Sequence, residues 1–242
     1  MTDLRVVSLV PSVTETLLGL GVTPVACTRF CGQPGIPTIG GTKDPDVDAI
    51  VALGPDIVIV NDEENRRADA DVLAAAGVAL HSMSPRSVGE VAPAIEALAA
   101  RLGVEAPASM PDRPARGPVH GRALILIWRR PWMSQSADTY GASMLDHLGW
   151  TNLLDPSARY PELSTDELHG MQPDLVVLPD EPYPFGARHV PELAAIVPGA
   201  RIVLVDGRDL LWWGIRTADA LARLERALER NSLHRRFRPD EG

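Results

Sequence analysis

Cysteine is scarce in this chain of 242 residues, which contains only Cys27 and Cys31. Two cysteines are too few for the disulfide framework that holds small secreted domains together. Six scattered histidines add no zinc motif, because the sequence contains no CxxC, HxxxH or HExxH. We therefore predict no metal site built from protein ligands. Cys31, which follows Phe30 at the end of an expected strand, is the thiol that we single out for testing.

An excess of basic charge is also absent. The formal net charge is -9 and the isoelectric point is about 5.1. Proteins that bind nucleic acid need clustered lysine and arginine to neutralise phosphates, so we expect no nucleic-acid partner. Hydrophobic residues make up 45% of the chain and charged residues 23%. This composition is ordinary for a soluble protein with a real core.

Long apolar runs and targeting signals are missing as well. No run approaches the ~20 residues of a membrane-spanning helix, and we expect no membrane insertion. The first residues show neither the basic and apolar regions of a secretory signal nor a cysteine for lipid attachment. The sequence as written predicts a cytoplasmic protein, and a periplasmic or otherwise extracytoplasmic one if its amino-terminal part is incomplete.

The signature motifs of common enzymes are not found. The sequence has no Walker loop, no GxGxxG fingerprint and no GxSxG elbow. Nucleotide-binding and hydrolase functions therefore lack support, and we name no catalytic residue and no intrinsic cofactor.

One pattern occurs twice. Residues 55–63 read PDIVIVNDE and residues 173–181 read PDLVVLPDE, 118 positions apart. In both copies Pro-Asp opens a buried apolar run and Asp-Glu closes it, with a helix expected on either side. Internal similarity at so long a period indicates two related lobes, since the repeats of solenoids are much shorter. Two lobes imply a cleft between them.

Strand and helix patterns alternate along the whole chain, and the strands are continuous apolar runs. This arrangement predicts an α/β fold in which two small parallel sheets are covered on both faces, bridged by a single helix. Capping boxes predict helix starts at Ser12, Ser87 and Ser164. We expect an amino-terminal lobe over 1–86, a linking helix and Pro-rich loop over 87–121, a carboxyl-terminal lobe over 122–230 and a polar tail over 231–242.

Aromatic residues are few, with five Trp, three Tyr and three Phe, but most of them follow expected strands. Ligands of open α/β sheets bind at the carboxyl ends of the strands. Our interpretation is that these rings line a ligand-binding cleft. The alternative is that they only pack in the interface between the lobes. The seven rings concerned are Phe30, Trp128, Trp132, Tyr183, Phe185, Trp212 and Trp213.

Charged residues stand beside these rings. Arg129, Arg130 and Arg216 could neutralise anionic groups of a ligand, or could be solvated surface residues. The acids at the ends of the two repeated strands, Glu63 with Glu64 and Glu181, allow three interpretations. They could cap the helices that follow, line the cleft, or dock on basic residues of a partner.

Several of these segments resemble the helical-backbone metal receptor family, the class III periplasmic binding proteins that deliver iron–siderophores, haem and vitamin B12 to ABC importers. The resemblance rests on Ser8-Leu9-Val10-Pro11-Ser12-x-Thr14-Glu15, the strand Pro55-Asp56-Ile57-Val58, and Gly40-Gly41. It spans about residues 4–229, and the segments 62–67, 128–133 and 181–185 resemble a subgroup described as cobalamin-binding.

The resemblance implies two α/β lobes bridged by one helix, with the ligand between them. It implies that rings of both lobes clamp a corrinoid, a role that suits Trp132, Tyr183, Phe185, Trp212 and Trp213. It also implies one docking glutamate per lobe for a membrane permease, with Glu63 or Glu64 and Glu181 as candidates.

We therefore expect a non-enzymatic binding protein for a cobalamin-like corrinoid or a related metal chelate such as an iron–siderophore or haem. Its partners are the small chelate itself and an ABC permease. The alternative is a cytosolic enzyme or handling protein that acts on a tetrapyrrole or metal chelate. A third hypothesis is an interaction module whose cleft is only a subunit interface.

Overall fold

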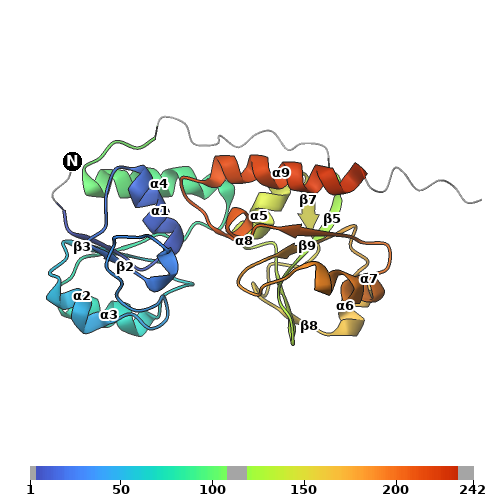
Figure 1. Ribbon diagram of the computed structural model, residues 1–242, viewed down its shortest axis with the longest axis horizontal. Coiled ribbons are helices and arrows are strands. Elements are labelled where there is room, and N and C mark those ends of the chain that lie inside the picture. Colours follow the sequence, from blue (N-terminus) through green and yellow to red (C-terminus); the bar gives the residue numbers. More distant parts are fainter. Residues whose placement is uncertain (1–3, 108–118, 234–242) are drawn as a thin grey trace, which may run out of the picture. The chain divides into compact units, whose positions relative to one another are not determined.

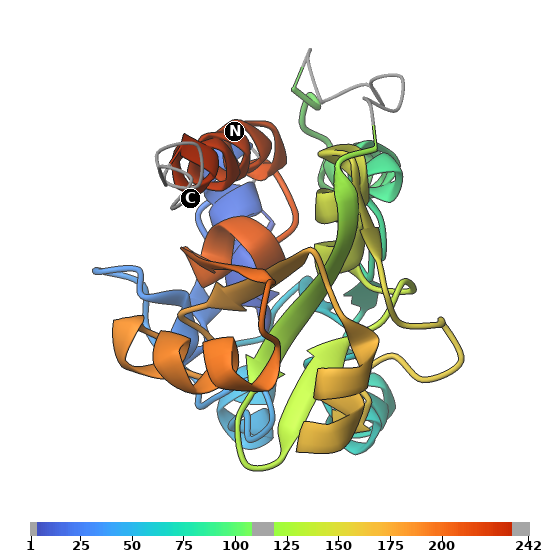
Figure 2. The same ribbon diagram turned by 90° about the vertical axis from the view of Figure 1, so that its right-hand side faces the viewer.

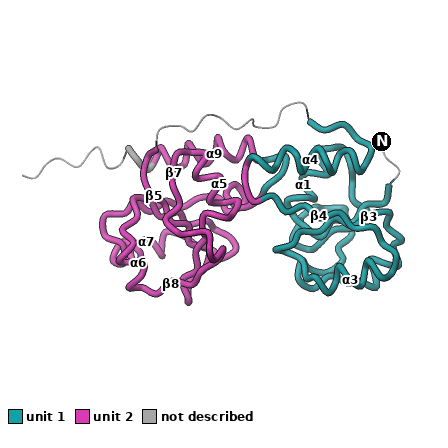
Figure 3. Tube along the Cα trace, turned by 180° about the vertical axis from the view of Figure 1, so that it is seen from behind, with its two compact units in different colours: residues 1–85, 89–110, 213–216 teal, residues 86–88, 111–212, 217–242 magenta. Residues whose placement is uncertain are grey.

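The computed structural model describes residues 4–107 and 119–233, and within them the chain divides into two compact units (Figure 3). The described part of the first unit comprises residues 4–85, 89–107 and 213–216, and the second comprises 86–88, 119–212 and 217–233. The helix that we assigned to the link thus groups almost wholly with the first unit. Most of the predicted Pro-rich loop and of the polar tail lies outside the described residues.

The first unit is built on a four-stranded parallel sheet with strand order β2-β1-β3-β4. Helices α2 and α3 lie on one face of the sheet and α1 and α4 on the other (Figure 1). Apolar side chains such as Val7, Val58 and Leu73 fill the space under α2 and α3. The elements are β1 Val6–Ser8, α1 Pro11–Gly19, β2 Ala26–Cys27, η1 Arg29–Cys31, α2 Val47–Ala52, β3 Ile57–Val60, α3 Arg67–Ala75, β4 Leu80–Ser82 and α4 Val88–Leu102.

The second unit is built on a six-stranded sheet with order β10-β9-β5-β6-β8, and β7 also pairs with β5 (Figure 2). Strands β5, β9 and β10 are parallel, as predicted. The sequence did not reveal β7, which is parallel to β5, or the antiparallel strands β6 and β8. The elements are β5 Gly121–Trp128, β6 Trp132–Gln135, α5 Tyr140–His147, β7 Trp150–Asn152, β8 Glu162–Leu163, α6 Thr165–Met171, β9 Leu175–Pro179, η2 Ala187–His189, α7 Val190–Ile196, β10 Arg201–Val205, α8 Gly207–Leu211 and α9 Thr217–Leu233.

The repeated sequence forms equivalent strands of the two units. Strand β3 lies between β1 and β4, and β9 lies between β10 and β5, so each copy is an inner strand of its sheet. Every residue of both strands is buried. Helix α2 precedes β3 and helix α6 precedes β9. The prediction of two related parallel-sheet lobes is confirmed.

Helix starts show where local signals succeed and where they fail. Ser164 accepts from the Glu167 amide and Glu167 accepts from the Ser164 amide, which is the predicted capping box. The box predicted at Ser12 is wrong, because the cap residue of α1 is Val10, two residues earlier, and the Ser12 hydroxyl is buried without a hydrogen bond. Proline favours the first helical position, where its missing N–H costs nothing.

Helix α4 begins at Val88, directly after Ser87, where the sequence predicts a helix start, and it continues past Pro93. Among the described residues, no helix combines the length and apolar character needed to cross a bilayer.

Candidate functional site

Five rings meet at the carboxyl ends of strands β5 and β9 in the second unit. We call them the ring cluster: Trp128, Trp132, Tyr183, Phe185 and His189. Trp128 ends β5, Trp132 begins β6, and Tyr183 and Phe185 follow β9. The Tyr183 ring lies edge-on to Trp128 at 5.6 Å and 4.7 Å from Phe185, and Phe185 stacks on Trp132 at 6.4 Å. These centroid distances are those of mutually stabilising aromatic pairs.

The ring cluster has a buried base and an exposed edge. Trp132 is 8% exposed and Phe185 is 5% exposed, and both pack into the core beside Leu126 and Leu178. Trp128 is 41% exposed, and Tyr183 is partly exposed. Trp128 and Tyr183 are therefore the rings of this cluster that a ligand can reach, while Trp132 and Phe185 hold them in place from behind.

A partly exposed ion pair lies at the edge of the ring cluster. Arg129 donates to both carboxylate oxygens of Glu192, at 2.8 and 2.9 Å, and its guanidinium lies 5.8 Å from the Trp132 ring centroid. The hydrogen bond with Glu192 raises the pKa of Arg129, and the same bond lowers the pKa of Glu192. Arg129 is thus committed to Glu192, whereas Arg130 is exposed at the turn between β5 and β6.

Glu181 lies at the end of β9 beside Trp212. Burial raises the pKa of the Glu181 carboxyl, and a hydrogen bond from the Trp212 side chain and the charge of Arg208 partly oppose this rise. The Arg208 guanidinium in turn lies 4.9 Å from the Trp212 ring centroid. Glu181 packs closely against residue 207, which must be glycine for this contact, because a Cβ there would lie 2.3 Å from Cγ of Glu181.

The interpretation of the strand-end acids as caps of the helices that follow is wrong. Helix α3 has Arg66 at its cap position and α7 has His189, and neither cap has a side-chain hydrogen bond. Glu181 instead faces Trp212. Docking on a partner and contact with a ligand both stay predictions for these acids.

Stability near pH 4.5 is expected to report the environment of Glu181. Since its folded-state pKa lies above the ordinary value of 4.5, the folded protein binds this proton more tightly than the unfolded chain. The stability that protonated Glu181 contributes is therefore fully present below pH 4.5, and it is lost as the pH rises through the folded-state pKa. Glu181→Gln should remove this loss, so that thermal unfolding midpoints across this window fall less steeply than in the unchanged protein.

Glu167→Gln is the matched control, because its pKa shifts the other way. Hydrogen bonds from Ser164 lower the pKa of Glu167, so this carboxylate stabilises the fold above its ordinary value of 4.5 and loses that effect as the pH falls through the folded-state pKa. Identical pH profiles for the two variants would contradict the assignment.

The first unit offers one exposed ring and two acids. Phe30 is 53% exposed in η1, with the Arg29 guanidinium 4.8 Å from its ring centroid. Glu63 and Glu64 form the turn after β3, where both backbone amides donate to Asn61 Oδ1, at 2.8 and 2.9 Å. Asn61 is an unpredicted organiser of this turn, because only the folded chain shows which groups its amide reaches.

The last two predicted residues also lie in the first unit. Trp213 is 5% exposed, and Arg216 lies 3.2 Å from a carboxylate oxygen of Glu15. The two cysteines are buried there as well, and burial raises the pKa of Cys27 to about 12. Cys31 accepts a hydrogen bond from Thr14 at 3.1 Å. A buried, protonated thiol is a poor nucleophile, so Cys27 offers no catalytic group.

The structure thus brings together four predicted rings and Arg129, and places Glu181 against Trp212. Phe30, Glu63, Glu64, Trp213 and Arg216 belong to the other unit. His189, Glu192 and Arg208 were not predicted from the sequence, because only the fold brings them into contact with these residues. Within the described ranges, no group of three His, Cys, Asp or Glu side chains is placed to hold a metal ion.

Comparison with known proteins bears out the resemblance. Residues 6–109 match the family described as periplasmic binding protein. The "Vitamin B12-binding protein" of Yersinia pestis (strain Pestoides F) is 24% identical over 193 residues, covering 72% of this chain and 69% of that protein.

Two solved structures show the same fold at low sequence identity. The periplasmic vitamin B12 binding protein BtuF of Vibrio cholerae is 16% identical, with a TM-score of 0.74 and coverage of 94% of this chain and 97% of that one. The periplasmic haem-binding protein BhuT, in complex with two haems, is 22% identical, with a TM-score of 0.75 and coverage of 94% and 98%.

Proposed function

We propose that this chain, a relative of the periplasmic binding proteins through residues 6–109, is a non-enzymatic binding protein for a flat metal chelate of the corrinoid or haem type. The observation that carries the proposal is the ring cluster, in which exposed rings stand on a buried aromatic base. The similar proteins described above bind vitamin B12 or haem, which supports the same class of ligand.

The chemistry of the ring cluster suits such a ligand. A macrocycle presents a wide apolar face, and Trp128 and Tyr183 supply apolar area whose geometry is fixed by Trp132 and Phe185. Exposed Arg130 beside them suits carboxylate groups at the rim of a ligand, because a guanidinium matches carboxylate geometry.

A titration followed by tryptophan fluorescence tests this function. The purified protein is titrated separately with cyanocobalamin, haemin and a ferric siderophore. We expect at least one of them to bind with a Kd tighter than about 100 μM, which corresponds to some −5.5 kcal/mol. The proposal fails if none of the three binds at that level, or if mass spectrometry shows that the protein converts the bound chelate into a product.

An ABC permease partner is part of the same proposal, with Glu63, Glu64 and Glu181 as candidate docking acids. Glu63 is exposed, whereas Glu181 is half-buried against Trp212, so Glu63→Lys is the sharper variant. It should abolish stimulation of a reconstituted permease without changing chelate affinity. The cytoplasmic location predicted from the sequence also stays a prediction, which fractionation of the source cells tests.

A further inference from the structure

Strand β10 forms one edge of the sheet in the second unit, next to β9. The Arg201 amide donates to a residue that flanks β9, and the Val205 carbonyl accepts from another. Main-chain groups of alternate residues face alternate sides of a strand, so the N–H and C=O groups of Ile202 and Leu204 point away from the sheet. Within the described ranges, these outward groups form no hydrogen bond.

The edge of β10 lacks the devices that usually prevent pairing with another chain. Such devices include a proline, a charged side chain or a bulge. Residues 202–205 read IVLV, and β10 keeps an unbroken register with β9. Leu204 is 38% exposed. This edge therefore has the properties of a surface to which an extended peptide adds as a further strand.

A groove of about 670 Å³ is lined by both β10 and helix α9. Its volume lies within the roughly 300–1,000 Å³ that is usual for ligand sites. Arg201 lines a smaller pocket together with side chains of α9, so the odd-numbered side chains of β10 face α9 and Leu204 faces the other way. In a strand added at this edge, every second side chain would likewise face α9.

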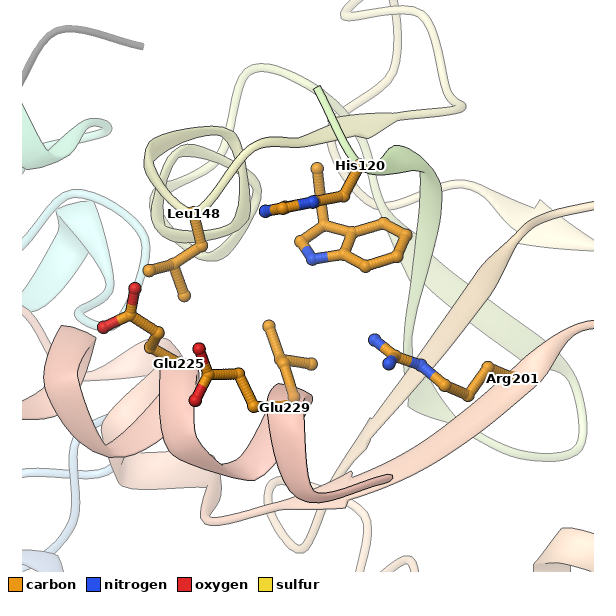
Figure 4. A pocket seen from close by; sticks show the side chains of 7 residues that line it. His120, Leu148, Arg201, Glu225 and Glu229 are labelled. Carbon is orange, nitrogen blue, oxygen red and sulfur yellow. The ribbon is translucent and has the colours of Figure 1, made fainter. Parts of the chain in front are cut away.

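The charges of α9 separate onto two sides of the helix. Figure 4 shows Glu225 and Glu229 beside the smaller pocket of about 120 Å³, whereas Arg226 and Arg230 line the groove. Both arginines are exposed, and neither forms an ion pair with another residue of the described chain. They are four residues apart, where like charges destabilise a helix, and a carboxylate between them would relieve the repulsion.

The aspartates that line the same groove are already bonded within the chain. Asp209 accepts from Arg223 at 2.7 Å, and Asp206 caps helix α8 by accepting from two of its amides. Asp180 accepts from the Gly207 amide at 2.7 Å. The arginines of the groove are therefore the charges that a partner can best neutralise, and that partner must be acidic.

We propose that β10 binds an extended acidic peptide of a partner protein as an added strand. Main-chain groups of the peptide pair with Ile202 and Leu204, its acidic side chains face Arg226 and Arg230, and its apolar side chains lie beside Leu204. The alternation of acidic and apolar residues follows from the alternation of side chains along a strand. The proposal does not depend on chelate binding.

Fluorescence anisotropy with a labelled heptapeptide of alternating glutamate and valine tests the proposal. We expect a Kd of about 100 μM or tighter, and at least ten-fold weaker binding when lysine replaces glutamate. Two further peptides are methylated at the backbone nitrogens of the valines or of the glutamates. Because strand addition directs only one of these two sets toward β10, one methylated peptide should bind at least ten-fold more weakly than the other. No binding, or equal affinities of the two methylated peptides, overturns the proposal.

Variants locate the binding. The double variant Arg226→Gln with Arg230→Gln should weaken the peptide at least ten-fold, whereas Arg66→Gln with Arg67→Gln, two exposed arginines of the first unit, should not. Equal affinities of these two double variants would overturn the assignment to the groove.

Leu204→Pro removes an outward N–H and should also weaken the peptide at least ten-fold, since an edge strand tolerates proline at such a position. If this variant does not fold, the two methylated peptides still decide the question. A protein that is already dimeric, and that Leu204→Pro converts to a monomer, would make a second copy the occupant of the edge and overturn the proposal.

Discussion

Replacing Tyr183 by alanine is expected to weaken chelate binding at least ten-fold, which corresponds to about 1.4 kcal/mol. Tyr183 is the hub of the ring cluster, because its ring contacts Trp128, Phe185 and His189 at 5.6, 4.7 and 5.5 Å. Its removal takes away a ligand contact and also the ring that orients Trp128. Aromatic anchors of this kind dominate binding energies. Fluorescence titration with the best chelate measures the change.

Two matched variants separate binding from general damage. Tyr183→Phe keeps the ring and removes only the hydroxyl, which is hydrogen-bonded to Arg129, so it should retain most of the affinity. Tyr160→Ala removes a tyrosine that is 38% exposed and lies outside the ring cluster, and should have no effect. If Tyr183→Ala binds as tightly as Tyr160→Ala, the ring cluster is not the binding surface.

Replacing Arg223 by methionine is expected to lower the free energy of unfolding by about 2–3 kcal/mol. Arg223 donates to both carboxylate oxygens of Asp209, each at 2.7 Å, and Asp209 is only 5% exposed. The variant leaves this carboxylate buried without its main countercharge. The expected loss is below that of a fully buried pair because the Arg223 side chain is 41% exposed. Urea unfolding measures it.

The control for Arg223 is Arg226→Met on the same helix. Arg226 is exposed, so this change should stay within about 0.5 kcal/mol of the unchanged protein. The double variant Asp209→Leu with Arg223→Met should recover part of the loss, because no charge is then left buried without a partner. A similar stability for Arg223→Met and Arg226→Met would contradict the structural role of the pair.

The repeated strands were predictable because their signal is local and strong. A run of four or five apolar residues between Pro-Asp and Asp-Glu leaves few alternatives to a buried inner strand, and β3 and β9 confirm it. Capping signals were less decisive. Ser164 caps its helix, but the proline before Ser12 takes the first helical position and moves the helix start two residues earlier, so the same motif fails.

The position of the candidate site was predictable from the sequence, but the exposure of each of its rings was not. Carboxyl ends of adjacent parallel strands meet at one edge, so rings that follow β5 and β9 had to lie near one another. Which rings are exposed depends on partners that local patterns do not reveal. Trp132 is buried because it lies in the antiparallel strand β6, paired with β8, and neither strand has a strong local signal.

The most direct test of the central claim is ¹⁹F NMR of protein labelled with 5-fluorotryptophan, recorded with and without the chelate that binds best. Each of the five tryptophan resonances is assigned by a single Trp→Phe variant. We predict that the Trp128 resonance shifts on binding. The Trp150 resonance, at the opposite end of the sheet, should stay unchanged. A chelate that shifts Trp150 alone, or binds without shifting Trp128, would contradict a binding surface at the ring cluster.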